Sequence, residues 1–315
     1  RPAPGAYRKQ KVQRHVDALR EQGFEVKVFE GDTKLLGQLG KFLPSDPQTG
    51  APGGIVLNLA TGVQGAGRFA QIPAMLELAG VAYTGPDPAA HAQLGDRFAL
   101  MSLLADAGIG VPRFRLVEDA DDTDGITFPA AVRPRLEPDA RRTVVRNERS
   151  LRSALREIRS DYGQPAVVEE IVSGREIRVS LIGNDDLECL PLLEYTRGAD
   201  GKTCPALLED GLAAQVRECA RQTFRALRCR DYARIDIRLT QFGEPVVTDV
   251  SWHGLFARRG SFMQSAETAG YGFGVLLRRI VTEAARRYVS DRREDDADVQ
   301  PPSVVSLADR RAAAG

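Results

Sequence analysis

Two kinds of hydrophobic spacing alternate along the first 85 residues, and this alternation restricts the fold more than any other feature of the sequence. Between Lys11 and Gly23, the apolar residues Val12, Val16 and Leu19 recur at helical spacing. The segment FEVKVFEG that follows alternates apolar and polar residues as a strand does. A helix at about 33–43, the strand GIVLNL, a helix through AQIPAMLELAG and the short strand VAYTG continue the series. The first third is therefore predicted to form an α/β layer.

The rest of the chain predicts two α+β units and a tail. A helix at about 87–107 precedes strands in FRLV, FPAAVRP and RTVVRN, a helix at 150–161 and the strand AVVEEIV. Beyond position 174, the strands REIRVSLIG and LECLPLLEY lead to a helix near 208–228, the strands YARIDIRLT and EPVVTDVS, and a helix at 273–288. From residue 291 the chain is polar and unpatterned, which favours a flexible tail. The predicted divisions are 1–86, 87–173, 174–290 and 291–315.

Composition excludes several classes of protein. The 43 basic and 43 acidic side chains cancel, which removes the electrostatic case for binding nucleic acid or a membrane surface. No apolar run approaches the roughly 18 residues of a membrane span. The cysteines show no C-x-x-C pairing, so buried thiols in a reducing compartment are expected and a zinc site is not. The amino end lacks the apolar core of a signal peptide, which predicts a cytoplasmic chain.

Five segments occur in an order and spacing that resemble the ATP-grasp superfamily and, within it, the D-alanine-D-alanine ligase group. They are GGIVLNLATGVQGAGRFAQIPAMLELAGVAYTGPDP, FPAAVRP, VVEEIVSGREIRVSLIGN, FRALRCRDYARIDIRL and VVTDVSWHG, and they span about residues 50 to 290. The resemblance implies an ATP-grasp fold, in which an amino-terminal α/β domain abuts two α+β subdomains that clasp ATP and Mg²⁺. It also implies a ligase reaction in which a carboxylate becomes an acyl phosphate before an amine attacks it.

By this resemblance, the strand AVVEEIV lies along the adenine and ribose of the nucleotide. The corresponding residues are Glu169, Glu170 and Ile171 at the adenine and Glu176 at the ribose hydroxyls. A carboxylate is a good acceptor for two vicinal hydroxyls. Simpler interpretations stay open: the paired glutamates face water, and Glu176 forms an ion pair with Arg175 or Arg178.

At the phosphates the chain departs from the family pattern. Arg97 and Arg133 stand where the family has lysines, and arginine keeps the charge but not the compact ammonium. The family's glycine- and serine-rich loop is replaced by RLEPDARRT, residues 135–143, which has no glycine to bring backbone amides close to an anion. Arg135, Arg141 and Arg142 could act instead as side-chain clamps.

The metal ligands of the family correspond here to Asp236, Asp249 and Ser251. Residues two apart on a strand share a face, so Asp249 and Ser251 are expected to converge. Because an aspartate is shorter than the glutamate it replaces, one magnesium ion fits this set better than two. An ion pair of Asp236 with Arg234 or Arg238 is the alternative. Arg234 itself corresponds to the family arginine that holds substrate and the developing oxyanion, a catalytic role.

The residues that would bind the substrate match the family pattern least. Ser261 in RRGSF corresponds to the serine that binds the product-side carboxylate, with a simple glycine-serine turn as the alternative. No acidic residue precedes Glu21, although the family has a glutamate near its start that receives the substrate ammonium. The family's long covering loop is reduced to YTRGADGKT.

Three functions remain open from the sequence. The first is a degenerate ligase-like protein, a pseudoenzyme that binds nucleotide weakly and serves as a binding or partner subunit. The second is an active ATP-dependent carboxylate-amine ligase with an altered substrate, and the third is a small-molecule binding protein on the same scaffold. The expected ligands are a nucleotide and a small amino-acid-like molecule, with no nucleic acid or membrane, and a homodimer or partner protein is the expected assembly.

Overall fold

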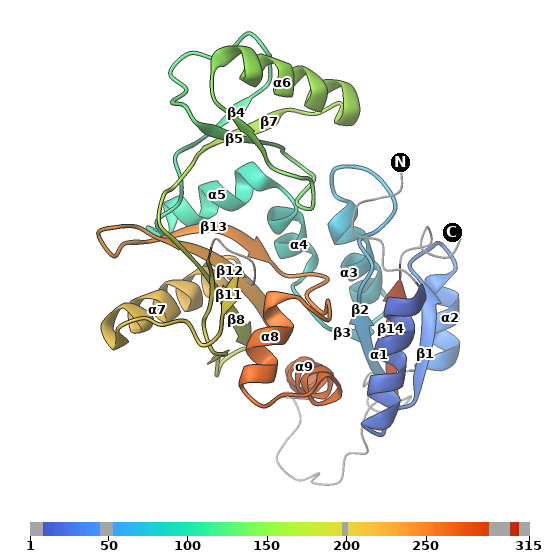
Figure 1. Cartoon of the computed structure of the whole chain (residues 1–315). Coiled ribbons are helices and arrows are strands. Elements are labelled where there is room, and N and C mark those ends of the chain that lie inside the picture. The colour runs from blue at the N-terminus through green and yellow to red at the C-terminus, as the bar shows by residue number, and fades with distance from the viewer. Residues whose placement is uncertain (1–8, 45–52, 197–200, 290–302, 309–315) are drawn as a thin grey trace.

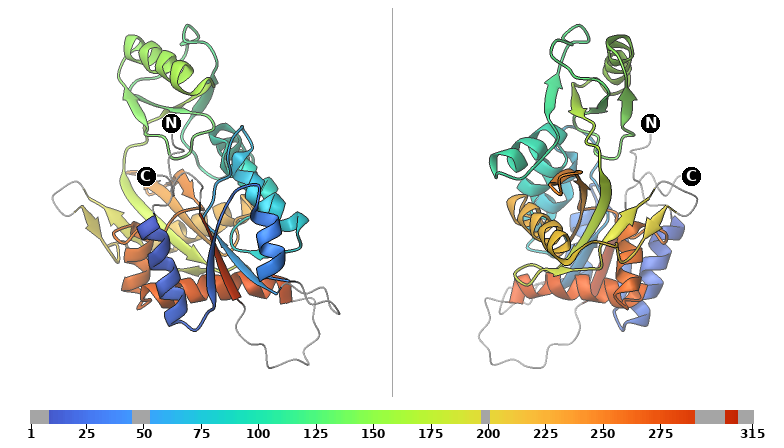
Figure 2. Two further views of the ribbon diagram at one scale, coloured as in Figure 1. Left: turned by 90° about the vertical axis from the view of Figure 1, so that its right-hand side faces the viewer. Right: turned by 60° about the vertical axis from the view of Figure 1, so that its left-hand side comes forward.

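The computed structural model describes residues 9–44, 53–196, 201–289 and 303–308. Three sheets organise these residues (Figure 1). The first has the order β1-β14-β2-β3, the second β4-β7-β5-β6, and the third β11-β10-β8-β12-β13, with β9 paired to β8. Figure 2 shows the second sheet and its helix α6 standing above the other two. This mixed α/β arrangement is the expected ATP-grasp fold.

The amino-terminal α/β layer forms as predicted. Its elements are α1 (Lys9–Glu21), β1 (Val26–Glu30), α2 (Leu35–Phe42), β2 (Gly54–Asn58), α3 (Arg68–Leu78) and β3 (Ala82–Tyr83). All strand pairs of this sheet are parallel. The core of the layer includes Leu19, Leu57 and Leu76, which are fully buried.

The expectation of a flexible tail is wrong for residues 303–308. Strand β14 (Ser303–Ala308) lies between β1 and β2 and pairs in parallel with both, so that Val304 stands opposite Val26 on one side and Ile55 on the other. The short apolar sequence SVVSLA suits a strand, but the polar sequence around it hid this signal. The other residues of the predicted tail lie outside the described part of the chain.

The central unit differs from the prediction in one helix. The predicted helix at 87–107 is two helices, α4 (Pro88–Leu94) and α5 (Arg97–Asp106), because Asp96 caps the second by accepting hydrogen bonds from the amides of Phe98 and Ala99. This break places Arg97 at the first position of α5. The remaining elements are β4 (Phe114–Val117), β5 (Ala130–Pro134), β6 (Thr143–Val145), α6 (Glu148–Tyr162) and β7 (Ala166–Glu170).

The carboxy-terminal unit contains β8 (Arg175–Ile182), β9 (Glu188–Cys189), β10 (Leu193–Tyr195), β11 (Lys202–Thr203), α7 (Asp210–Ala226), β12 (Tyr232–Leu239), β13 (Pro245–Ser251), α8 (Ser261–Thr268) and α9 (Phe273–Val289). The alternative of a simple turn at Ser261 is wrong, because this residue begins the helix α8. The four cysteines are free thiols, two of them buried and two only partly buried. No helix within the described ranges is long and apolar enough to cross a membrane.

Asp231 joins the first domain to the carboxy-terminal unit. Its carboxylate is fully buried and accepts hydrogen bonds from the amide of Gly85 at 2.7 Å, after β3, and from the side chain of Asn184 at 3.1 Å, after β8. Arg287 of α9 binds it through two nitrogens, at 3.0 and 2.9 Å. One side chain therefore holds three segments that are distant in the sequence.

Two buried histidines predict a loss of stability in mild acid. Burial lowers the pKa of His91 to about 3 and that of His15 to about 4, so both are neutral in the folded protein. The Nδ1 atom of His91 also accepts a hydrogen bond from Trp252 at 3.2 Å, which a proton would break. Both rings take up protons near pH 6.5 once the protein is unfolded. Above that pH, the histidines therefore cause no loss in the free energy of unfolding. It should fall by about 1.4 kcal/mol per histidine for each pH unit below it, until the folded pKa is reached.

Urea unfolding at pH 7.0, 6.0 and 5.5 measures this loss. His91→Gln removes one of the two titrating rings and should reduce the dependence on pH by about half. An unfolding free energy that stays constant from pH 7.0 to 5.5 in the parent protein would contradict the prediction.

Candidate functional site

The two acids assigned to the metal face each other across neighbouring strands. In the antiparallel pair of β12 and β13, Asp236 stands opposite Asp249 and Arg234 opposite Ser251. On the other side of β12, Arg178 of β8 stands opposite Asp236. Like charges directly opposite one another repel unless cations lie between them. The register therefore brings the predicted metal residues together and requires positive charge beside them.

Two arginines neutralise Asp236. Arg234 binds it through Nε at 2.7 Å and Nη2 at 3.1 Å, and Nε of Arg178 lies 3.5 Å from it. Burial raises the pKa of Asp236 above its ordinary value in spite of these cations. Arg234 also donates to Ser251 Oγ at 2.9 Å. The ion pair between Asp236 and Arg234 that the sequence left open is thus formed, whereas Arg238 pairs elsewhere.

Asp249 is held by the two arginines that the resemblance assigns to phosphate. Arg97 reaches it with Nη1 at 3.1 Å and Arg133 with Nη1 at 3.3 Å. Burial opposes the charged form of Asp249, but these two guanidinium groups hold its pKa below the ordinary value. Nη2 of Arg97 also donates to the carbonyl of Thr248 at 2.7 Å. The first turn of α5 and strand β5 are therefore tied directly to β13.

Glu169 completes this cluster from the side of β7. It forms an ion pair with Nε of Arg97, and Nε of Arg133 lies 3.6 Å away. Only 3% of its side chain is exposed, so the interpretation in which both glutamates face water is wrong for Glu169. Its neighbour Glu170 is 40% exposed and pairs with the exposed Arg113 at 2.9 Å. We define the cleft cluster as Arg97, Arg133, Arg178, Arg234, Glu169, Asp236 and Asp249.

The other two residues assigned to the nucleotide lie where the second and third sheets connect. Ile171 follows β7 at the start of the link to β8. Glu176, on β8, pairs with Arg238 at 2.6 Å and Arg178 at 3.2 Å. Of the two ion pairs proposed for Glu176, the one with Arg178 is present, whereas Arg175 binds Glu194 at 2.7 Å.

In this arrangement the donor set does not fit magnesium. The ion requires several oxygen ligands at about 2.0–2.1 Å in octahedral geometry. The oxygens of Asp236 and Asp249 are occupied by guanidinium nitrogens, and Ser251 accepts from Arg234. Within the described ranges, no group of three or more His, Cys, Asp or Glu side chains is placed to hold a metal ion. A metal could enter only by displacing these arginines.

The arginines of the segment 135–143 are not equivalent. Arg135 binds Asp96 at 2.7 Å, so it is committed within the fold. Arg142 forms no ion pair with the described residues, and burial lowers its pKa, with smaller contributions from Arg133 and Arg238. Arg142 is therefore near the cleft cluster and available to an anion.

Ser261 lies beside the cleft cluster. Its hydroxyl is buried at the start of α8, and Nη1 of Arg178 lies 3.3 Å from it. Arg178 also donates to Tyr195 at 3.1 Å and lies over its ring. Sequence reasoning named Arg178 only as a partner for Glu176. Strand alternation, which puts both residues on one face of β8, was the signal that could have placed it in the site.

Comparison with known proteins gives a match to one family. The family model described as D-ala D-ala ligase C-terminus matches residues 103–282. An uncharacterized protein, y4sG of Sinorhizobium fredii, is 38% identical over 292 residues, which cover 87% of each chain. The D-alanine–D-alanine ligase of Syntrophobacter fumaroxidans is 29% identical over 237 residues, 68% of this chain and 76% of the ligase.

Solved structures show the same fold. The D-alanine-D-alanine ligase from Coxiella burnetii superposes with a TM-score of 0.66 at 21% identity, over 75% of this chain and 69% of the ligase. The ligase from Bacillus anthracis, complexed with ATP, gives a TM-score of 0.62 at 22% identity over 70% and 75%. Because the family model matches residues 103–282, more than half of the chain, this chain belongs to the D-alanine-D-alanine ligase family of ATP-grasp proteins.

Proposed function

We propose that this protein is a degenerate member of its family, which binds nucleotide weakly and does not join D-alanine. The observation that carries the proposal is the pairing of Arg97 and Arg133 with Asp249. By the family pattern, the arginines belong to the phosphates of ATP and the aspartate to the metal. Here the two arginines and the aspartate form ion pairs with each other, so the arginines are not free for phosphate and the aspartate is not free for a metal.

The energetics of the cleft cluster support this view. Arg97 and Glu169 are almost completely buried, so neither regains hydration while the pair stays closed. A nucleotide phosphate would have to displace Asp249 or Glu169 from the arginines, and the released carboxylate would then face the phosphate charge. ATP binding would therefore lose much of the electrostatic gain that phosphate-arginine contacts usually provide.

Phosphate release in the presence of ATP, Mg²⁺ and D-alanine tests the proposal. We expect no more inorganic phosphate than in a control without protein, because the groups that would stabilise the transferring phosphoryl group are held away from it. Turnover well above the control, reduced by Arg234→Ala, would contradict the proposal and support an active enzyme. Sensitivity to that variant excludes a contaminating ATPase as the source.

A second candidate is an active ATP-dependent carboxylate-amine ligase with an altered substrate. It is favoured by Arg142, which has no ion-pair partner among the described residues and whose pKa is lowered by burial and by the nearby Arg133. Under this alternative, Arg142 takes over the role of the missing glycine-rich loop and contacts the terminal phosphate. Screening carboxylate-amine pairs for ATP consumption tests it: turnover that depends on Arg142, but not on the committed Arg135, would favour this candidate.

A further inference from the structure

Strand β14 has a central place in the first sheet, although it comes from the other end of the sequence. It lies between β1 and β2, as Figure 1 shows, and pairs in parallel with all the residues of both strands. Among the described residues, β14 is the one strand that pairs with β1. Because neighbouring strands lie about 4.8 Å apart, a sheet without β14 would have a gap of one strand between β1 and β2.

Helix α1 has the position of a crossover helix between β14 and β1. Parallel neighbours in a sheet are joined by a crossover connection, which is usually a helix packed on the strands. Helix α1 contacts both β14 and β1, and its buried residues Val16 and Leu19 share a cluster with Val26 of β1. No strand within the described ranges precedes α1 in the sequence. The strand that completes a βαβ unit with α1 and β1 is therefore β14.

The next crossover in the chain lies on the opposite face of the sheet. Helix α2 connects β1 to β2, and its residues Leu35 and Leu39 share a cluster with Val56 of β2. The neighbouring Ile55 belongs instead to the cluster of α1, and successive residues of a strand point to opposite faces. Between β1 and β2 the chain passes over one strand position, and β14 fills that position.

The strand order supports the same interpretation. Counted from β14, the strands β14, β1, β2 and β3 are first, second, third and fourth, and their order across the sheet is 2-1-3-4. This is a common order in doubly wound sheets, where the first strand is internal and helices cover both faces. Counted by position in the sequence, the same sheet has its last strand inserted between its first two.

We infer that this chain is a circular permutation of a doubly wound domain. Strand β14 is the first strand of a βαβ unit, and the α1 and β1 of that unit lie at the opposite end of the sequence. Residues 303–308 thus belong to the amino-terminal domain and are its central strand. This arrangement of the sheet does not depend on whether the cleft binds nucleotide, so it is independent of the proposed function.

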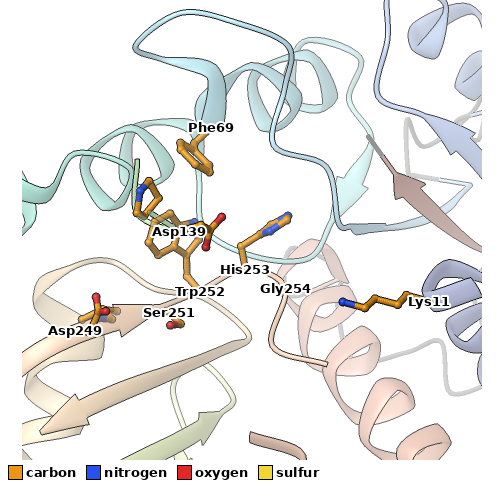
Figure 3. A pocket seen from close by; sticks show the side chains of 10 residues that line it. Lys11, Phe69, Asp139, Asp249, Ser251, Trp252, His253 and Gly254 are labelled. Carbon is orange, nitrogen blue, oxygen red and sulfur yellow. The ribbon is translucent and has the colours of Figure 1, made fainter. Parts of the chain in front are cut away.

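The divided unit also positions one wall of the cleft. Figure 3 shows Lys11 of α1 at one end of a small cavity that is also lined by Asp249 and Ser251 of β13. Helix α1 is held between α9 and the strands β1 and β14. A strand from the far end of the sequence therefore helps to place a residue beside the candidate site.

A rearranged chain tests the inference. It keeps all 315 residues but places residues 303–315 before residue 1, so that the sequence ends at residue 302. The βαβ unit is then contiguous. We expect a urea midpoint equal to that of the parent or above it, because the paired strands β14 and β1 are joined by a much shorter connection. Hydrogen exchange should show the same protection of residues 26–30 in both proteins, since β14 occupies the same place.

Val305→Pro, made in both chain orders, identifies the strand that fills the gap. Val305 stands opposite Lys27 and Val56, and proline in a central strand removes a backbone hydrogen bond. It should lower both urea midpoints by about 1 M and expose residues 26–30 to exchange in both proteins. The matched control is Ser303→Pro, at the first position of the strand, where proline is tolerated and the change should be much smaller.

Three results would overturn the inference. One is a rearranged chain that does not fold or that unfolds at a clearly lower urea concentration than the parent. Another is the loss of protection at residues 26–30 in a rearranged chain that does fold. The third is a Val305→Pro effect that is present in the parent order and absent from the rearranged order, because β14 would then not fill the same gap in both.

Discussion

Replacing Arg97 with methionine is expected to lower the free energy of unfolding by about 3–5 kcal/mol. Methionine fills most of the space but leaves Glu169 buried, with its next cation, Arg133, at 3.6 Å. An ionised carboxylate that loses its partner in such a place keeps its full desolvation cost. The same change removes the hydrogen bond from Arg97 to Thr248, and with it one tie between α5 and β13.

Urea unfolding followed by the fluorescence of Trp252, the single tryptophan of the chain, measures this effect. The matched control is Arg113→Met, which breaks the exposed pair with Glu170 one residue further along β7 and should change stability little. The double variant Arg97→Met/Glu169→Leu removes both buried charges and should recover most of the loss. If Arg97→Met is no less stable than Arg113→Met, the buried pair does not have the role assigned to it.

The second large effect is expected from Asp231→Ala, which should also lower the free energy of unfolding by about 3–5 kcal/mol. The change leaves Arg287, which is 17% exposed, without its bidentate partner and the amide of Gly85 without its acceptor. Because these groups belong to α9 and to the end of β3, the loss weakens the attachment of the first domain as well as the local structure.

Asp231→Asn is the informative companion variant. The residue has φ of 66°, a left-handed conformation that asparagine tolerates better than most residues. Asparagine also keeps one acceptor oxygen. The variant therefore measures the effect of losing the charge while the left-handed backbone conformation is still tolerated. We expect its stability to lie between those of the parent and Asp231→Ala in the same unfolding measurement. Equal stability of all three proteins would show that the contacts of Asp231 contribute nothing.

Local patterns predicted most of the fold, since each depends on residues close together in the sequence. The alternation in YARIDIRLT and EPVVTDVS located β12 and β13, and the resemblance to the family implied that Asp236, Asp249 and Ser251 lie together on these two strands. The helix break before Arg97 was missed because Asp96 acts as a cap within an otherwise continuous apolar pattern. Strand β14 was missed because its partners lie at the opposite end of the sequence.

The candidate site was predicted less completely, for a physical reason. The sequence identified which residues converge, but the partner of each charge depends on contacts between units. Arg97 on α5 and Asp249 on β13 meet only when the central and carboxy-terminal units pack together, and no spacing within either unit reveals the pair.

The central position of β14 affects how the chain can fold during its synthesis. Strands β1 and β2 leave the ribosome early, yet each pairs with a strand that is made about 250 to 280 residues later. At a translation rate of roughly 5–20 residues per second, their inner edges stay without this partner for many seconds. Unpaired strand edges invite association with other chains. The amino-terminal domain, although synthesised first, is therefore expected to be the last to complete its sheet, and a nascent chain stalled before residue 303 should be especially dependent on chaperones.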